Sequence, residues 1–261
     1  MGRRRGRSTV LWTVGGLLAT VAILTTYSAL TSEEQPTSAR PGATAPPPTP
    51  RNTATPIPLE TYSAPATWTE PTRWQALPRG SRAAANGRET GFPDSVDGAV
   101  AMLVAASAIN AQGSRSLADE QWAIYAAYTA SSEQSAALSQ KVREGTARTD
   151  ASTRAAMGLE TTGPMPSGAH IRSQAVGFKI IRSAPGIVST HLLVRSTQKA
   201  GELQPEKVSY IVCALSVAWR EGDWKFTARP TSDRADEAPA IAAPGDAAFN
   251  SAGWTAIRQA S

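Results

Sequence analysis

The chain has 261 residues, a formal net charge of +5 and a sequence pI near 9.7. A pI this high is common in nucleic-acid-binding proteins, but four of the basic residues lie within the first seven positions. From Arg82 onward 18 basic residues are balanced by 17 acidic ones, so direct nucleic-acid binding is not expected. Because Cys213 is the only cysteine, an internal disulfide is excluded and a folded domain has to be stabilised by its apolar core.

An uncharged, largely apolar run occupies residues 10–30, directly after the N-terminal arginines. A helix of about 21 residues, at ~1.5 Å per residue, is roughly 30 Å long, which is the thickness of the hydrocarbon core of a bilayer. The arginines predict a cytoplasmic basic tail at residues 1–9, a transmembrane helix at 10–30 and an extracytoplasmic location for everything after Leu30. We therefore expect a single-pass protein of the cell membrane.

A cleaved signal peptide is the alternative interpretation of the same residues. Its apolar core would be shorter than this run, and it would end in a small-x-small cleavage site. The only candidate near the end of the run is Tyr27–Leu30, which is a poor cleavage site. The retained span is therefore favoured.

Residues 31–81 are expected to form an extracytoplasmic linker rich in proline and threonine. Residues 35–78 hold 11 of the 19 prolines, including the runs at residues 46–50 and 56–58. Such runs favour polyproline II over helix or sheet interior and make the segment a semi-rigid spacer, with a Pro-x-x-Pro ligand as the alternative. Aromatic side chains in a linker usually pack on something, so Trp68 and Trp74 are predicted to contact the folded domain or a partner.

The first half of the folded region has helical patterning. Apolar residues at three- and four-residue spacing predict a helix over residues 97–111. Ser116 followed by Asp119 resembles a capping box and predicts the start of a second helix. Two shorter helical pieces are expected after it, with N-caps at Ser131 or Ser132 and at Asp150.

The second half has the period-two patterning of strands. Alternating stretches occupy residues 170–182, 187–195, 207–219 and 224–229, with a tight turn at Arg220–Asp223. Short turns between successive strands favour an antiparallel meander, and helices followed by strands indicate an α+β domain, expected over residues 82–232. Residues 233–261 are expected to form a loop and a short terminal helix, in which Phe249, Trp254 and Ile257 share one face.

The residues that could carry chemistry do not form a recognisable set. His191, Tyr210 and Asp223 are the polar candidates on the predicted sheet, but no pair of a general acid and a general base is visible, and Asp223 is explained by its place in the turn. His170 and His191 with Cys213 lack the spacing of a metal site. No catalytic, cofactor-binding or metal-binding residues are therefore predicted.

The remaining unusual residues have structural interpretations. Cys213 lies on an apolar strand and is interpreted as a buried small hydrophobic residue. Trp219 and Trp224 are interpreted as core or hairpin packing. Gly177, within a strand, predicts a β-bulge or close packing.

The hairpin Val217–Phe226, which contains Trp-Arg-Glu-Gly-Asp-Trp-Lys, resembles the last hairpin of the nuclear transport factor 2-like fold. That fold is a cone in which N-terminal helices pack on a curved antiparallel sheet. Further short motifs are similar to those of actinobacterial single-span proteins with an extracytoplasmic domain of this fold: Trp74-x-x-Leu77-Pro78, Gly91-Phe92, Gly98-Ala99-Val100 with Ala105-Ala106, the strand Ala175–Ile180, and Gly253-Trp254.

Such proteins resemble the bitopic scaffold subunit of type IV secretion and conjugation systems, in which the domain is an assembly surface. This resemblance implies a non-enzymatic, membrane-anchored scaffold subunit that binds other proteins or self-associates, with no small-molecule substrate. Trp68, Trp74 and Trp254 are the predicted partner contacts. The alternatives are a cell-envelope ligand-binding module of the same fold and a small-molecule isomerase or hydratase.

Overall fold

The computed structural model describes residues 62–227 and 238–258. The predicted basic tail, the predicted span and the proline runs of the linker lie outside these ranges. Within the described ranges, no helix combines the length and the apolar character needed to cross a membrane.

The described chain forms one large sheet, one small ladder and four α-helices. The strands are β1 (Trp74–Ala76), β2 (Arg82–Ala83), β3 (Glu89–Thr90), β4 (Ile109–Gln112), β5 (His170–Ala184), β6 (Ile187–Lys199), β7 (Lys207–Arg220), β8 (Asp223–Phe226) and β9 (Thr255–Arg258). The helices are α2 (Val96–Ser107), α3 (Leu117–Tyr128), α4 (Ala136–Ala156) and α5 (Ala247–Ser251), with a 3₁₀ turn at Ser131–Glu133.

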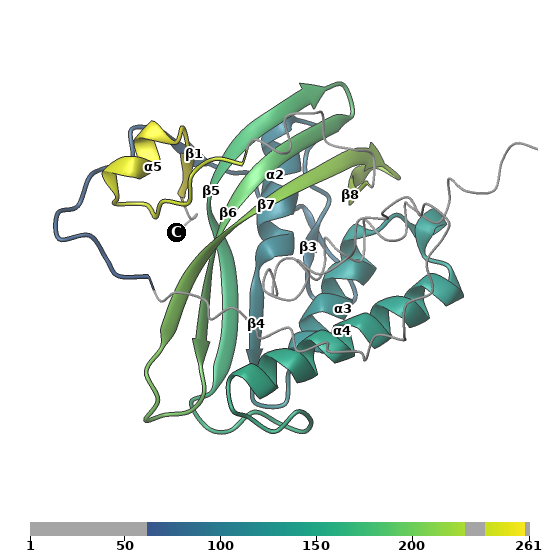
Figure 1. Cartoon of the computed structure of the whole chain (residues 1–261). Helices are drawn as coiled ribbons and strands as arrows, with labels where there is room; N and C mark the ends of the chain where they lie inside the picture. The colour runs from purple at the N-terminus through teal and green to yellow at the C-terminus, as the bar shows by residue number, and fades with distance from the viewer. Residues whose placement is uncertain (1–61, 228–237, 259–261) are drawn as a thin grey trace, which may run out of the picture.

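The large sheet has seven strands in the order β1-β9-β5-β6-β7-β8, and β4 pairs with the start of β5. Figure 1 shows a strongly curved sheet, with α2, α3 and α4 on one side of β5–β7 and with β1 and α5 on the other. Strands β5 to β8 follow one another as antiparallel neighbours, which confirms the predicted meander and the α+β class. Register shifts in β5 at Ala175/Gly177 and Ile180/Arg182 mark bulges, which bend a strand and increase its twist.

The β7–β8 turn has the geometry that a two-residue hairpin requires. Glu221 and Gly222 have φ values of 55° and 71°, so both central residues are left-handed, as in a type I′ turn. Trp224 is buried and meets Trp219 edge-on with ring centroids 5.4 Å apart, which confirms the predicted hairpin packing.

Helix α2 packs in the concavity of the sheet and is held at both ends. Ser95 is its N-cap and accepts a bond from the Gly98 amide, and a Cβ at Gly98 would overlap the Pro93 carbonyl. At the other end, the Ser107 hydroxyl accepts a bond from the Ala175 amide at 2.9 Å, and the Ser173 hydroxyl donates to the Ser107 carbonyl at 2.7 Å.

The helix predicted over residues 97–111 is therefore shorter than expected. Its last part leaves the helix at Ala108, which has an extended backbone, and continues as β4. There the backbone groups pair with β5, a tertiary contact that the apolar spacing does not reveal.

Helix α3 confirms the predicted capping box, because Ser116 and Asp119 bond each other's backbone amides. The Ser116 hydroxyl and, next, the Ser116 amide donate to the Asp119 carboxylate, and these two bonds lower the pKa of Asp119 below its usual value. The two shorter pieces predicted after it form one 21-residue helix, α4, capped by Ser135. Asp150 does not begin a helix; it is buried within α4, where its carboxylate accepts bonds from the Leu117 amide and from Arg154.

Successive side chains of β6 enter two different cores. Leu192 faces the main core, formed with α2, α3 and α4, whereas Leu193 faces a second cluster with Phe249 and Trp254. Cys213 is 1 % exposed in the main core, as predicted, and burial raises its pKa to about 12. A Cβ at Gly177 would lie 3.1 Å from the Phe249 ring, so both the predicted bulge and the close packing are present.

The second core corrects two expectations about the ends of the domain. β1 pairs in parallel with β9, so the sheet begins before the predicted boundary at residue 82 and includes part of the predicted linker. The short terminal helix expected within residues 233–261 has only five residues, α5; it ends before Gly253 (φ 80°) and is followed by β9 instead of continuing to share a face with Trp254 and Ile257.

Asp223 connects the hairpin to the segment that precedes α2. It is 3 % exposed and accepts bonds from the amides of Gly91, Phe92 and Trp224 at 2.8, 3.1 and 2.9 Å. The indole of Trp224 donates to the Pro93 carbonyl. The assignment of Asp223 to turn chemistry alone is therefore wrong, since its carboxylate joins segments more than 130 residues apart.

We predict that Asp223→Ala destabilises the protein by about 3 kcal/mol, because it leaves buried amides without an acceptor. The loss is measured by chemical denaturation of the purified full chain. The exposed Asp94→Ala is the matched control and should change the free energy of unfolding by less than about 0.5 kcal/mol. Equal effects of the two variants would contradict this role of Asp223.

Candidate functional site

The polar residues considered from the sequence do not come together. His191 pairs with Ala214 in the β6–β7 register and is buried. Tyr210 packs edge-on against Tyr62 next to the second core, with its pKa raised by burial. Asp223 lies at the start of β8, with its carboxylate on backbone amides. The described residues therefore hold no acid–base pair made of these side chains.

The three residues weighed as possible metal ligands, His170, His191 and Cys213, are not grouped around one point. His170 bonds Glu206 at 3.0 Å, and Cys213 lies in the main core. Among residues 62–227 and 238–258 no group of three histidine, cysteine or carboxylate side chains is placed to hold a metal ion.

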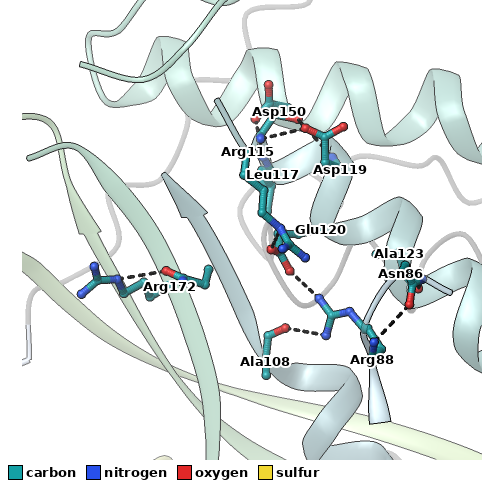
Figure 2. Close-up of polar contacts among 12 residues, drawn as sticks. Asn86, Arg88, Ala108, Arg115, Leu117, Asp119, Glu120, Ala123, Asp150 and Arg172 are labelled. Carbon is teal, nitrogen blue, oxygen red and sulfur yellow. Dashed lines mark hydrogen bonds and ion pairs between the residues drawn. The ribbon is translucent and has the colours of Figure 1, made fainter. Parts of the chain in front are cut away.

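A charged cluster does form between β3, α2 and α3, and Figure 2 shows its centre. Glu120 is 3 % exposed and makes ion pairs with Arg88 and Arg115, one through each carboxylate oxygen. Arg88 also donates to the carbonyls of Ala105 and Ala108 at 3.2 and 2.9 Å, at the C-terminal end of α2. A cation at this position is favoured by the partial negative charge of the helix end.

The cost of burying Arg88 is offset by these partners. Burial lowers the pKa of Arg88, and the Coulomb attraction of Glu120 opposes this effect. A buried arginine that keeps its charge needs such an acceptor set. The cluster therefore acts as a bracket that holds β3, the end of α2 and the start of α3 together.

A cleft of about 490 Å³ lies beside this bracket. Its walls include Arg88, Arg115, Glu120, Tyr128 and Asn110. The carboxylate of Glu120 is shared between both arginines, and the Tyr128 hydroxyl donates to the Glu89 carbonyl. Of the two arginines, only Arg115 is substantially exposed, with 53 % of its side chain accessible against 9 % for Arg88.

Two exposed tryptophans form a second and different kind of site. Trp68 is 60 % exposed and Trp74 is 38 % exposed, which is unusual for the largest apolar side chain. Their indole N–H groups donate to the two oxygens of a single carboxylate, that of Glu70, at 2.9 and 3.1 Å. We call Trp68, Glu70 and Trp74 the tryptophan platform.

The backbone beneath the platform is tied to the C-terminal segment. The Thr69 amide donates to the Gly245 carbonyl at 2.7 Å. The side chain of Asn250 accepts a bond from the Thr72 amide and donates to the Glu70 carbonyl. A Cβ at Gly245 would overlap the ring of Trp68, so a glycine is needed for the indole to lie against the backbone. The platform is therefore held by contacts from both sides.

The three predicted partner contacts separate into two groups. Trp68 and Trp74 are both exposed and both contact the domain, Trp68 at Gly245 and Trp74 through the pairing of β1 with β9. Trp254 is fully buried in the second core, where its indole donates to the Ala240 carbonyl. The expectation that Trp254 contacts a partner is wrong, because β9 pairs inside the sheet and turns this side chain inward.

Glu70 was missed by the sequence analysis. The signal that pointed to it is its position between two tryptophans, because an indole N–H in a polar segment needs an acceptor. The bracket residues Arg88 and Glu120 were also missed. Their partners come from separate elements, and no local pattern relates them.

Comparison with known proteins returned no relatives. No family model matches the chain, no curated protein matches it, and no solved structure matches it. The geometry of the described residues therefore carries the functional proposal.

We predict that Glu120→Ala destabilises the protein by about 3 kcal/mol or more, because Arg88 would keep a buried charge without its carboxylate. The free energy of unfolding is measured by chemical denaturation. Replacing the exposed Glu160 by alanine removes the same charge and should have an effect below about 0.5 kcal/mol. A small loss for Glu120→Ala would show that the bracket is dispensable.

We also predict opposite behaviour for two tryptophans. Trp254→Ala should cost about 3–5 kcal/mol, since a large side chain is removed from a closed core. Trp68→Ala should cost less than about 1 kcal/mol, because the residue is already 60 % exposed to water. Thermal and denaturant unfolding of both variants distinguishes a core residue from a surface residue, and a similar loss for both would contradict the assignment.

Proposed function

We propose that this chain is a non-enzymatic, single-pass membrane protein that acts as an assembly subunit of a conjugative DNA-transfer or secretion apparatus. Its extracytoplasmic domain would bind protein partners through the tryptophan platform. The observation that carries this proposal is the locking of two exposed indoles around the carboxylate of Glu70.

The platform has the properties of a protein-contact site. Tryptophan is enriched among the residues that dominate binding energy at interfaces. Both indole N–H groups already have an acceptor, so binding a partner need not leave them unpaired. Since Asn250 and Gly245 hold the backbone in place, little conformational freedom remains to be lost on binding.

The interior of the fold supports a non-catalytic role. The space between α2 and the curved sheet is occupied by apolar side chains of the main core, among them Met102, Leu103 and Phe178. The arrangement of helices within a curved antiparallel sheet is consistent with the proposed nuclear transport factor 2-like cone. In this proposal the outer surface of the cone, rather than its interior, meets the partner.

The proposed anchor and spacer give the platform its location. Residues 10–30 would cross the membrane, and the proline-rich linker would hold the domain outside the cytoplasm. The platform lies at the point where the linker meets the domain, because Trp68 precedes the large sheet and Trp74 is the first residue of its first strand, β1. A partner bound there would contact the base of the domain.

A second candidate function is a cell-envelope ligand-binding module. The cleft of about 490 Å³ beside the half-exposed Arg115 favours it, with an anionic ligand as the chemistry that fits a guanidinium. Native mass spectrometry of the full chain, released from detergent, tests this candidate. A bound mass that is lost in Arg115→Ala would support it, and a bare chain in both samples would not.

The assembly proposal is tested by photo-crosslinking in intact cells. A benzophenone amino acid at the exposed Thr67 should crosslink to another protein, whereas the same probe at Leu203, which is 98 % exposed in the turn between β6 and β7, should not. The crosslink from Thr67 should disappear when Trp68 and Trp74 are both replaced by alanine. Crosslinks of equal yield from both positions, or none from Thr67 at native expression, would contradict the proposal.

A further inference from the structure

We infer that the tryptophan platform binds a polyproline II segment followed by arginine, and that its occupant is the run of residues 46–51 in a neighbouring copy of this chain. This inference rests on the proposed function and names the partner for the same surface. It implies that copies of the chain associate head to tail, with residues 46–51 of one copy bound to the tryptophan platform of the next.

The geometry of the platform fits a polyproline helix. Such segments are bound by surfaces lined with aromatic rings, and they lose little entropy on binding because they are already extended. The indole rings of Trp68 and Trp74 are arranged around one carboxylate, the two residues are 60 % and 38 % exposed, and the Arg258 guanidinium lies 5.8 Å from the centroid of the Trp74 ring. The run Pro46-Pro47-Pro48-Thr49-Pro50 is the densest cluster of prolines in the chain.

The charge of the platform fits the residue that follows the run. Arg51 comes directly after Pro50, and Glu70 lies between the two indoles. A carboxylate has about four lone-pair sites, so two indole N–H bonds leave capacity for a guanidinium. An arginine can use such an acceptor through its planar fork of N–H groups. The prolines would therefore lie on the rings while Arg51 approaches Glu70.

The length of the chain favours a neighbouring copy over the same chain. The described part begins at Tyr62, whose amide donates to the Val208 carbonyl and whose ring packs on Tyr210, only six residues before Trp68. A run of the same chain would have to return to the platform past Tyr62 within the residues that separate Arg51 from Tyr62, and the sequence Pro56-Ile57-Pro58 in that stretch favours extended polyproline II over a tight turn. A run from another copy can approach without this return. Anchors in a common membrane would also raise the effective concentration of neighbouring runs.

The inference is tested with a synthetic peptide of residues 43–54 that carries a fluorophore, and fluorescence anisotropy is the readout. The acceptor is the detergent-solubilised full chain with Pro47, Pro48 and Pro50 replaced by alanine, which removes the chain's own competing run at residues 46–50. We expect saturable binding, and Trp68→Ala with Trp74→Ala should weaken it at least about tenfold. Leu203→Ala, an exposed apolar residue far along the chain, is the matched control and should leave binding unchanged.

Two further arms do not depend on how well the tryptophan variants fold. A peptide with Arg51→Ala should bind several-fold more weakly, and Glu70→Gln should weaken the normal peptide by a similar factor. The two changes together should be no worse than either alone, as expected for two residues that contact each other. Additive effects, or full binding by a peptide with its prolines replaced by alanine, would overturn the inference.

The choice of a neighbouring copy is tested in the full chain. A photo-crosslinker at Thr49 of an epitope-tagged copy should yield covalent dimers with an untagged copy, and these dimers should be lost when only the untagged copy carries Trp68→Ala and Trp74→Ala. Crosslinks confined to one chain would overturn the inference. If the peptide fails to bind while crosslinks from Thr67 to another protein persist, this inference fails and the proposed assembly function stands.

Discussion

The docking of α2 into the concavity of the sheet is the interaction on which the rest of the described structure depends. At its N-terminal end, the preceding loop is held by the Asp223 carboxylate and by the indole of Trp224. At its C-terminal end, Ser107 bonds β5 in both directions and Arg88 binds the free carbonyls. The N-terminus of the helix is capped by the adjacent Ser95, whereas the carbonyls at its C-terminal end are bonded by side chains of other segments. The same contacts determine where α2 ends and β4 begins.

A consequence of this arrangement is that the sheet has two covered faces. The inner face is closed by α2, α3 and α4, while part of the outer face is closed by α5 and by the β1–β9 pair. The parallel pairing of β1 with β9 joins segments that are about 180 residues apart. Near this pair, the segment before β1 that carries Trp68 is held to the C-terminal segment, because the amides of Thr69 and Thr72 donate to Gly245 and Asn250. The buried Trp254 and the exposed Trp68 thus both lie where the segment before β1 meets the C-terminal segment.

The two polar sites use their charges in different ways. In the bracket of Arg88, Glu120 and Arg115, charges from separate elements are paired with each other, which ties those elements together. At the tryptophan platform, the carboxylate of Glu70 accepts bonds from two uncharged indoles. It has no cationic partner among the described hydrogen bonds. In the bracket, both oxygens of the Glu120 carboxylate are already used by arginines of the same chain. The platform leaves a negative charge between exposed rings, which is the basis for assigning it to a partner.

The sequence by itself determined the local elements whose signals are local. The capping box at Ser116, the period-two strands, the tight turn at Glu221 and Gly222, and the burial of Cys213 all follow from neighbouring residues, and the structure has them. Only the tertiary structure decided that Asp150 lies inside α4, that Trp254 enters a core and that Glu70 joins Trp68 to Trp74. The physical reason is that those roles depend on backbone and side-chain partners supplied by distant segments, and the energy of such pairings has no counterpart in a local pattern.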